Sequence, residues 1–583
     1  MKNFIKQYKK LTSTPLSLVT GLAHKTREKV HSSKRIDTFS LGIGILSVLY
    51  RWYKPIIPLY YQKYDDALYV RYANSILKRN WLGDYLLQGN LTLAKPPGFA
   101  LFLSLSYIVH IPFTVLVQVL VVISALSILK CLVWIGANKQ ASSAGYCFTI
   151  FSPIWFGFDS SRVYRDSFLA SLMLAVIAMT LRMLVCFKEE TYKTKKVSFF
   201  ATAISFGVTI SLIRITKNVE FAIYVFIVFN ALLLVKNSRK AMAERIKILV
   251  IAMGVLIISM NSLTLVVKQL NRVNYGVAIT ENYTSGQFPK AMSVIASVVD
   301  VNQRKYVPIT QEMRKSIYRV SPTFRKLERF LELPDGVGWR SQPCSSPLKI
   351  CDETALWAPW ELRDAVVSAG LADNASQFEK TFGDISKEII RGCKSKMIEC
   401  GDRGVAPGIG PIREISLRHM VESTSITVRQ IFELAGSGGV SASFDPGVEE
   451  QEIKFWKETV HGIPANMPLD VYKPGINSGS ETLETLVSLY KPMWQAFFLF
   501  GVIGFILTSV NRRFHGSSQL FSVAISGLLG GAALCAQIAI AESEMGLFAL
   551  TSAYYLPVYP FFILFLTLGI GSLLDQFDLI TAS

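Results

Sequence analysis

Histidine is scarce in this sequence, and the usual nucleotide-binding motifs are missing. The six histidines are His24, His31, His110, His419, His461 and His515, and none stands in a His-x-x-x-His or His-Glu-x-x-His pattern. We therefore do not expect a histidine-based metal or protease site. A Walker A sequence and a Rossmann fingerprint are also absent, so a cytoplasmic nucleotide-binding module is not expected either.

Acidic residues are also few: 42 Asp and Glu stand against 61 Lys and Arg, which gives a net charge of +19. The cations concentrate in the N-terminal tail and in short loops between apolar segments, so they indicate membrane orientation and not a nucleic-acid partner. Hydrophobic residues make up 51% of the 583 residues, in runs that approach the length of a bilayer crossing. The sequence predicts a polytopic α-helical membrane protein.

About ten transmembrane helices are predicted from the apolar runs, and the loops between them set their orientation. The spans are placed at 37–60, 113–136, 141–158, 167–187, 197–213, 219–235, 247–268, 491–510, 518–541 and 555–574. Loops 188–196, 236–247 and 511–515 are rich in Lys and Arg and are expected in the cytoplasm. Both chain ends then face the cytoplasm of a bacterial inner or plasma membrane.

The spans divide the chain into four parts. A basic tail, 1–35, has no apolar core followed by a cleavage site and is not a signal peptide. An N-terminal transmembrane module, 36–268, contains a first extracytoplasmic loop at 61–112, and 491–583 holds the C-terminal transmembrane helices. The hydrophilic block between them, 269–490, is long enough for an α-rich or mixed extracytoplasmic soluble domain.

One apolar segment, 98–111, is too short for a full span and is bounded by prolines. We expect it to form a re-entrant or surface-lying helix. If it crossed the membrane, the loops before and after it would lie on opposite sides, and the basic loops would face outward.

Four of the eight cysteines, Cys344, Cys351, Cys393 and Cys400, lie in the hydrophilic block as two pairs of equal separation. An even number confined to a predicted exterior domain suggests two disulfides in an oxidising compartment. The local pairing, Cys344 with Cys351 and Cys393 with Cys400, is favoured among three connectivities. A zinc site is the alternative, although neither pair has the close ligand spacing of structural zinc.

Charged residues of both signs gather on one predicted membrane face. They are Asp65, Asp66, Arg71, Lys95, Arg162, Arg165 and Asp166. The adjacent carboxylates could be no more than acids favoured at the start of a helix. A carboxylate can also accept the proton of an attacking hydroxyl, while Arg and Lys neutralise a leaving phosphate. This combination indicates transfer from a lipid-linked phosphate.

The order of these elements resembles that of the GT-C membrane glycosyltransferases. The resemblance rests on Asp65-Asp66-Ala, Arg71-Tyr-Ala, Trp81-Leu-Gly-Asp-Tyr, Lys95-Pro-Pro-Gly, the Arg162/Asp166 turn and Tyr555-Leu-Pro-Val-Tyr-Pro560. Protein O-mannosyltransferases and lipid A aminoarabinose transferases are the most similar groups. The resemblance implies a GT-C-like bundle and inverting transfer of a sugar from a polyprenyl-phosphate donor to an extracytoplasmic glycan, lipid or protein. It does not extend to 269–490.

The resemblance also implies a role for each charged residue. Asp65 or Asp66 would be the base, Asp166 would help to hold the acceptor or a metal ion, and the donor phosphate would contact the four cations Arg71, Lys95, Arg162 and Arg165. The three carboxylates could jointly bind Mg²⁺ or Mn²⁺. The chain departs from the aminoarabinose transferases at Ala94, where they carry an acid. It has Ser552-Ala553-Tyr554 where the family often has Arg.

Two other classes of protein stay open. A transporter or flippase of lipid-linked sugars would also carry charges within the membrane, although the two halves of this chain show no inverted symmetry. In a binding or assembly protein, 269–490 would provide the recognition. Trp339, Trp357 and Trp360 could stack on sugar rings there, or could form the core of the domain.

Overall fold

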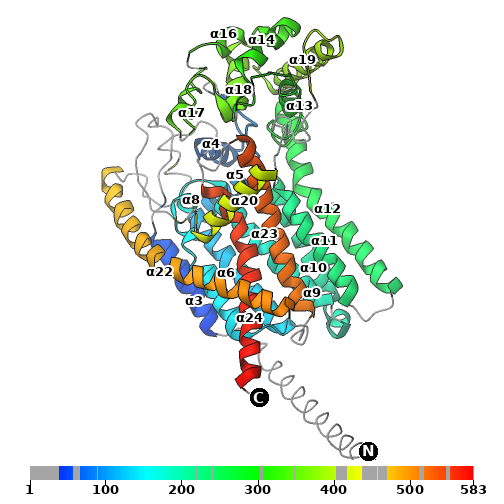
Figure 1. Cartoon of the computed structure of the whole chain (residues 1–583), viewed down its shortest axis with the longest axis vertical. Helices are drawn as coiled ribbons and strands as arrows, with labels where there is room; N and C mark the ends of the chain where they lie inside the picture. Colours follow the sequence, from blue (N-terminus) through cyan, green and yellow to red (C-terminus); the bar gives the residue numbers. More distant parts are fainter. Residues whose placement is uncertain are drawn as a thin grey trace, which may run out of the picture.

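The structure is a computed structural model in which long helices form a bundle and short helices cover one end of it (Figure 1). It describes residues 38–54, 56, 66–87, 90–187, 189–217, 219–237, 242–302, 304, 306–334, 336–346, 348–401, 417–435, 437, 456, 469–510, 518–545 and 552–581.

Within these ranges, seven helices are long and apolar enough to cross a membrane. They are α6 (Phe113–Ile135), α9 (Arg165–Phe187), α10 (Glu189–Arg214), α12 (Met242–Tyr275), α22 (Leu469–Val510), α23 (Ser518–Met545) and α24 (Tyr559–Thr581), the last preceded by the 3-10 helix η5 (Ser552–Val558). The neighbours α6, α10 and α24 all pack against α9, which is therefore central. The chain is an integral membrane protein.

The other three predicted spans correspond to shorter helices. They are α3 (Thr38–Tyr53), α7 (Lys139–Ile150) and α11 (Glu220–Asn237), with 16, 12 and 18 residues. The predicted span at 141–158 is not one continuous helix, because α7 ends at Ile150 and rises only about 18 Å. After it, Pro153 opens a separate 3-10 turn, η1 (Pro153–Trp155).

Short elements occupy the ends of the long helices. Between α3 and α6 lie α4 (Asp66–Leu77), an antiparallel hairpin of β1 (Leu86–Leu87) and β2 (Asn90–Leu91), and α5 (Gly98–Ile108); α8 (Phe158–Ser161) precedes α9. The 11 residues of α5 are too few for a crossing, in agreement with the expectation for 98–111. Figure 1 shows α4 and α5 between the bundle and the short helices above it.

The described residues of 276–401 form the group of short helices at that end of the bundle, which we call the cap (Figure 1). Its helices are α13 (Phe288–Ile295), α14 (Gln311–Val320), α15 (Pro322–Arg325), α16 (Glu328–Leu331), α17 (Ser341–Ser345), η2 (Ala355–Trp357), α18 (Ala358–Ser368) and α19 (Ala375–Lys394). Two disulfides, Cys344–Cys351 and Cys393–Cys400, close local loops in the cap. This is the pairing that the sequence favoured.

After the cap, the next described residues of the predicted block 269–490 pack on the bundle. Helix α20 (Leu417–Phe432) packs against α23. The indole of Trp494 on α22 donates to the carbonyl of Ile431 at 3.1 Å, and the Tyr559 hydroxyl donates to that of Ala435 at 2.9 Å. The chain that follows the cap therefore returns to the membrane helices, and α22 begins at Leu469, well before the predicted boundary.

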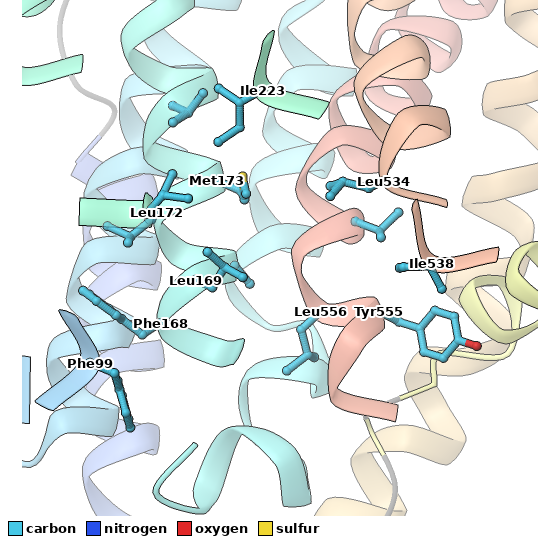
Figure 2. Close-up of a cluster of buried hydrophobic side chains, with 14 of the residues drawn as sticks. Phe99, Phe168, Leu169, Leu172, Met173, Ile223, Leu534, Ile538, Tyr555 and Leu556 are labelled. Atoms are coloured by element: carbon cyan, nitrogen blue, oxygen red, sulfur yellow. The ribbon is translucent and has the colours of Figure 1, made fainter. Parts of the chain in front are cut away.

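Apolar side chains from distant parts of the chain form the core beneath the short elements (Figure 2). The labelled members are Phe99, Phe168, Leu169, Leu172, Met173, Ile223, Leu534, Ile538, Tyr555 and Leu556. Phe102 of α5 stacks on Phe168 of α9 with ring centroids 4.0 Å apart. This packing fixes α5 and η5 against the first turns of α9, where charged residues cluster.

Candidate functional site

The first pair of the site joins α4 to the turn before α9. Asp66 is the first residue of α4, where a carboxylate is favoured by the helix dipole. Arg162 donates to both of its oxygens, from Nε to Oδ2 at 3.0 Å and from Nη2 to Oδ1 at 2.7 Å. Asp66 is completely buried and Arg162 is 5% exposed. A buried bidentate pair of this kind fixes the orientation of both groups.

The second pair joins the start of α9 to the segment after α10. Asp166 is the second residue of α9, and its Oδ1 lies 2.5 Å from Nζ of Lys217. Its Oδ2 is buried and has no hydrogen-bond partner. Since Asp166 is also completely buried, this oxygen is an open acceptor inside the site.

Lys217 is held between a carboxylate and an aromatic ring. Its ammonium lies 3.9 Å from the ring centroid of Tyr554, in η5. Burial lowers the pKa of Lys217 to about 8, against the opposing effect of Asp166, and the positive charges of Arg165 and Lys95 lower it further. At neutral pH the group is still a cation, but it loses its proton far more easily than an exposed lysine.

Arg165, the first residue of α9, adds another buried cation to the site. It is 8% exposed, and its Nη1 donates to the carbonyl of Thr216 at 3.3 Å. Its Nε is buried and has no hydrogen-bond partner. Arg165 therefore supports the backbone beside Lys217 and keeps one donor available for an anion.

Lys95 approaches the site from the loop between β2 and α5. It is half-buried, and its ammonium lies 4.8 Å from the centroid of Trp360 on α18 in the cap. Arg71 is half-buried on α4, more than one turn after Asp66. Lys95 is thus the predicted cation that lies between the membrane site and the cap.

A close approach of backbone places the Lys95 loop beside the Lys217 segment. The amide of Gly98 donates to the carbonyl of Ile215 at 2.6 Å. A Cβ atom at position 98 would meet that oxygen at 2.6 Å and would also clash with Oγ1 of Thr216, so no other residue fits without displacing the segment.

The structure brings together most of the residues that the sequence singled out. Asp66, Arg162, Arg165 and Asp166 lie in or beside the two pairs, with Lys95 at the edge facing the cap. Asp65 lies outside the described residues. Lys217 and Tyr554 were not identified as site residues from the sequence. The signal for Lys217 was its position just after the outer end of the predicted span 197–213, on the same predicted membrane face as Arg162.

The described carboxylates do not fit the predicted Mg²⁺ or Mn²⁺ site. Both oxygens of Asp66 accept from Arg162, and one oxygen of Asp166 is paired with Lys217. A divalent cation here would be repelled by the positive charges of Arg162 and Lys217. Among the residues that the structure describes, no group of three or more His, Cys, Asp or Glu side chains could hold a metal ion.

The fold and the site define a helical integral membrane protein with a buried, charged site at one end of its bundle. Among solved structures the chain is similar to ArnT from Cupriavidus metallidurans, in the apo state and bound to undecaprenyl phosphate. In both comparisons the identity is 11% and the TM-score is 0.30, over 92% of this chain and 77% of the ArnT chain.

ArnT is a GT-C lipid A aminoarabinose transferase, one of the groups that the sequence motifs resemble. At this identity and TM-score the likeness carries no argument about activity. No protein-family model and no curated protein matches the chain.

Proposed function

We propose that this protein is a membrane glycosyltransferase that transfers a sugar from a polyprenyl-phosphate donor to an extracytoplasmic acceptor. The observation that carries the proposal is the pair of buried ion pairs, Asp66–Arg162 and Asp166–Lys217, at the same end of the bundle. Such a site offers a proton acceptor and several anion-binding groups within one membrane protein.

The donor phosphate is proposed to bind among Lys217, Lys95 and Arg165. As the bond between the anomeric carbon and the phosphate oxygen breaks, negative charge grows on that oxygen, and these cations stabilise it. The polyprenyl chain would remain in the bilayer beside the helices. The cations then act on the leaving group alone, and the acceptor hydroxyl needs a separate base.

Asp66 is proposed as that base, with Asp65 as the alternative. The acceptor hydroxyl loses its proton to the carboxylate while its oxygen attacks the anomeric carbon from the face opposite the phosphate, which inverts the configuration. Arg162 donates to both oxygens of Asp66 and so fixes the orientation of the carboxylate. The open Oδ2 of Asp166 can accept a hydrogen bond from the acceptor and hold it in place.

Transport of the lipid-linked sugar is less well supported. Along α9 from Asp166, the side chains of Phe168, Leu169, Leu172 and Met173 are buried in the apolar core (Figure 2). A headgroup moving across the membrane needs polar partners along its path. In the described part of the bundle, these apolar side chains therefore favour a transfer reaction at one face of the membrane over transport through it.

The proposal is tested with the purified full-length protein in lipid nanodiscs. Undecaprenyl phosphate is the binding probe. Release of that lipid from undecaprenyl-phosphate-linked sugars, in the presence of membrane extract as acceptor source, measures turnover. We expect Lys217→Ala to weaken binding of the probe by about tenfold or more, because one charge-assisted hydrogen bond is lost. We expect Asp66→Asn to keep binding but to abolish turnover.

Asp84→Asn is the matched control, because this acid is exposed in the segment that follows α4, the helix of the proposed base. It should bind and turn over as the wild type does. Asp65→Asn decides which carboxylate is the base. Full turnover in both Asp65→Asn and Asp66→Asn, or no binding of undecaprenyl phosphate by the wild type, would overturn the proposal.

A further inference from the structure

Three aromatic side chains of the cap form a row, and Lys95 lies over its central ring. Tyr283 stacks on Trp360 with ring centroids 5.5 Å apart and an angle of 20° between the rings. Trp360 in turn lies 6.4 Å from Trp339, at 24°. The ammonium of Lys95 lies 4.8 Å from the centroid of Trp360. We call Tyr283, Trp360 and Trp339 the aromatic row.

The rings of the aromatic row are offset from one another. Parallel rings in contact are about 3.5 Å apart, so centroid separations of 5.5 and 6.4 Å require each ring to be displaced sideways past its neighbour. All three side chains are half-buried. Each ring therefore leaves part of its surface uncovered by the next.

The aromatic row differs from the aromatic core of the cap. Phe288, Phe378 and Phe382 of α13 and α19 pack against one another at 4.7 to 5.7 Å and are completely buried. The aromatic row lies at the edge of that core and reaches the surface. The indole N–H of Trp339 donates to Oδ2 of Asp364 at 2.8 Å. Because this bond fixes the ring, little rotamer freedom of Trp339 is lost when a ligand binds.

The position of the aromatic row connects it to the proposed site. Lys95 touches Trp360 and also contributes to the electrostatic environment of Lys217. Arg363 lies 5.7 Å from the centroid of Trp360 and supplies a further cation beside the row. A molecule lying on the rings would reach toward the place where the phosphate is proposed to bind.

We propose that the aromatic row is a subsite for the acceptor and that the acceptor is a glycan. This inference rests on the proposed function. The C–H face of a pyranose ring carries partial positive charge and stacks on the negative face of an aromatic ring. Three rings in succession match consecutive sugars of an oligosaccharide. An oligosaccharide is longer than the single sugar that the donor carries.

The test uses the full-length protein in nanodiscs on a printed array of bacterial surface glycans, without any lipid donor. We expect the wild type to bind at least one glycan class, and Trp360→Leu to weaken that binding by about tenfold. Trp357→Leu is the control, because Trp357 is a half-buried tryptophan of the cap outside the aromatic row. It should bind as the wild type does.

Binding of undecaprenyl phosphate by the same samples separates this inference from the proposed function. Trp360→Leu should keep full lipid binding, which also shows that it folds. Lipid binding without glycan binding by the wild type, or equal glycan binding by Trp360→Leu and the wild type, overturns the inference alone. An equal loss of glycan binding in Trp360→Leu and Trp357→Leu also overturns the inference. Glycan binding without lipid binding supports the subsite and overturns the proposed function.

Discussion

Burial of Asp66 with Arg162 and of Asp166 with Lys217 removes four ions from water. The attraction within each pair offsets that desolvation only in part, and apolar residues of similar size would often stabilise a fold equally well. Perturbed, buried charges concentrate at functional sites. The unpaired Oδ2 of Asp166 and Nε of Arg165 lie among these charges.

Lys217 gives the site a characteristic pH dependence. Since the pKa of Lys217 is lowered to about 8 by burial, the group is charged below that pH and neutral above it. Binding of undecaprenyl phosphate should therefore be strongest near neutral pH and should fall as the pH rises through about 8. An ordinary lysine would give this fall only above pH 10.

The variant Lys217→Arg isolates this effect, because a guanidinium stays protonated over the whole range. We expect its lipid affinity to stay constant from pH 7 to pH 9.5 in equilibrium binding measurements. If the wild-type profile is equally flat, Lys217 is not the cation that contacts the phosphate.

Glu361 of the cap gives a second pH dependence, this time of stability. Burial raises its pKa to about 7 from 4.5, and Thr354 donates to its Oε2 at 2.7 Å. Between those two pH values the folded state binds a proton that the unfolded state has lost. Stability is therefore lost as the pH rises from about 4.5 to about 7, by about 3 kcal/mol at most.

Glu361→Gln removes the titration and keeps the acceptor for Thr354. Hydrogen exchange of α18 should then show nearly the same protection at pH 5 and pH 8, whereas the wild type should be less protected at pH 8. Glu312→Gln is the control, since that acid is exposed on α14. A wild-type cap equally protected at both pH values contradicts the assignment.

The sequence could identify single charged residues at the ends of apolar runs, and it did so for Asp66, Arg162, Arg165 and Asp166. It could not identify Lys217, because the pairing with Asp166 crosses 51 positions and depends on how α9 and α10 pack. The aromatic row was equally ambiguous. Tryptophans of a core and tryptophans of a ligand site have the same sequence signal, and only their exposure separates them.

At the level of helices and loops, the junction of α5 with the segment after α10 controls the site. Gly98, three residues after Lys95, lies against Ile215 and Thr216. Lys217 is the next residue after Thr216. The prolines before α5 could be read from the sequence and correctly predicted its start. The span at 141–158 was predicted as one helix, but Pro153 interrupts the apolar run, which forms α7, η1 and α8.

Substitution of Gly98 tests this junction. In Gly98→Ala the new methyl group meets the carbonyl of Ile215 at 2.6 Å, and relief of that overlap should separate the two segments at a cost of about 1–3 kcal/mol. We expect weaker binding of undecaprenyl phosphate together with a lower melting temperature. Gly254→Ala is the control, because nothing lies within 4 Å of a Cβ at that helical position. Unchanged lipid binding in Gly98→Ala would contradict the role of the junction.

On the scale of the whole molecule, the cap is the part that sequence patterns described least. Its disulfides were predictable from the paired cysteines, but its fold was not. Its helices α13 to α18 have 11 residues or fewer, and irregular segments join them. The predicted block 269–490 also merged the cap with α20 and the start of α22, because polar composition does not reveal that α20 packs on α23.

The two disulfides predict which side of the membrane the cap occupies. When whole cells are denatured without reductant, a maleimide should label Cys131, Cys147, Cys186 and Cys535, which are free in the structure. The four cap cysteines should react only after reduction, because an extracytoplasmic compartment keeps them oxidised. A Cys393→Ser/Cys400→Ser variant should lower cap stability by about 2–3 kcal/mol. Labelling of all eight cysteines before reduction would place the cap in the cytoplasm.

Helix α12 continues without interruption for 34 residues, from Met242 to Tyr275. At 1.5 Å per residue it is about 51 Å long, more than the hydrocarbon thickness of a bilayer. Near its end, Asn271 accepts from Trp81 at 2.7 Å and Tyr275 donates to Gly83 at 2.8 Å, so it holds the loop that leads to Lys95. The bilayer sets the depth of a lipid phosphate, while α12 sets the height of that loop. Under the proposed function, the length of α12 therefore sets the distance between that loop and the lipid phosphate.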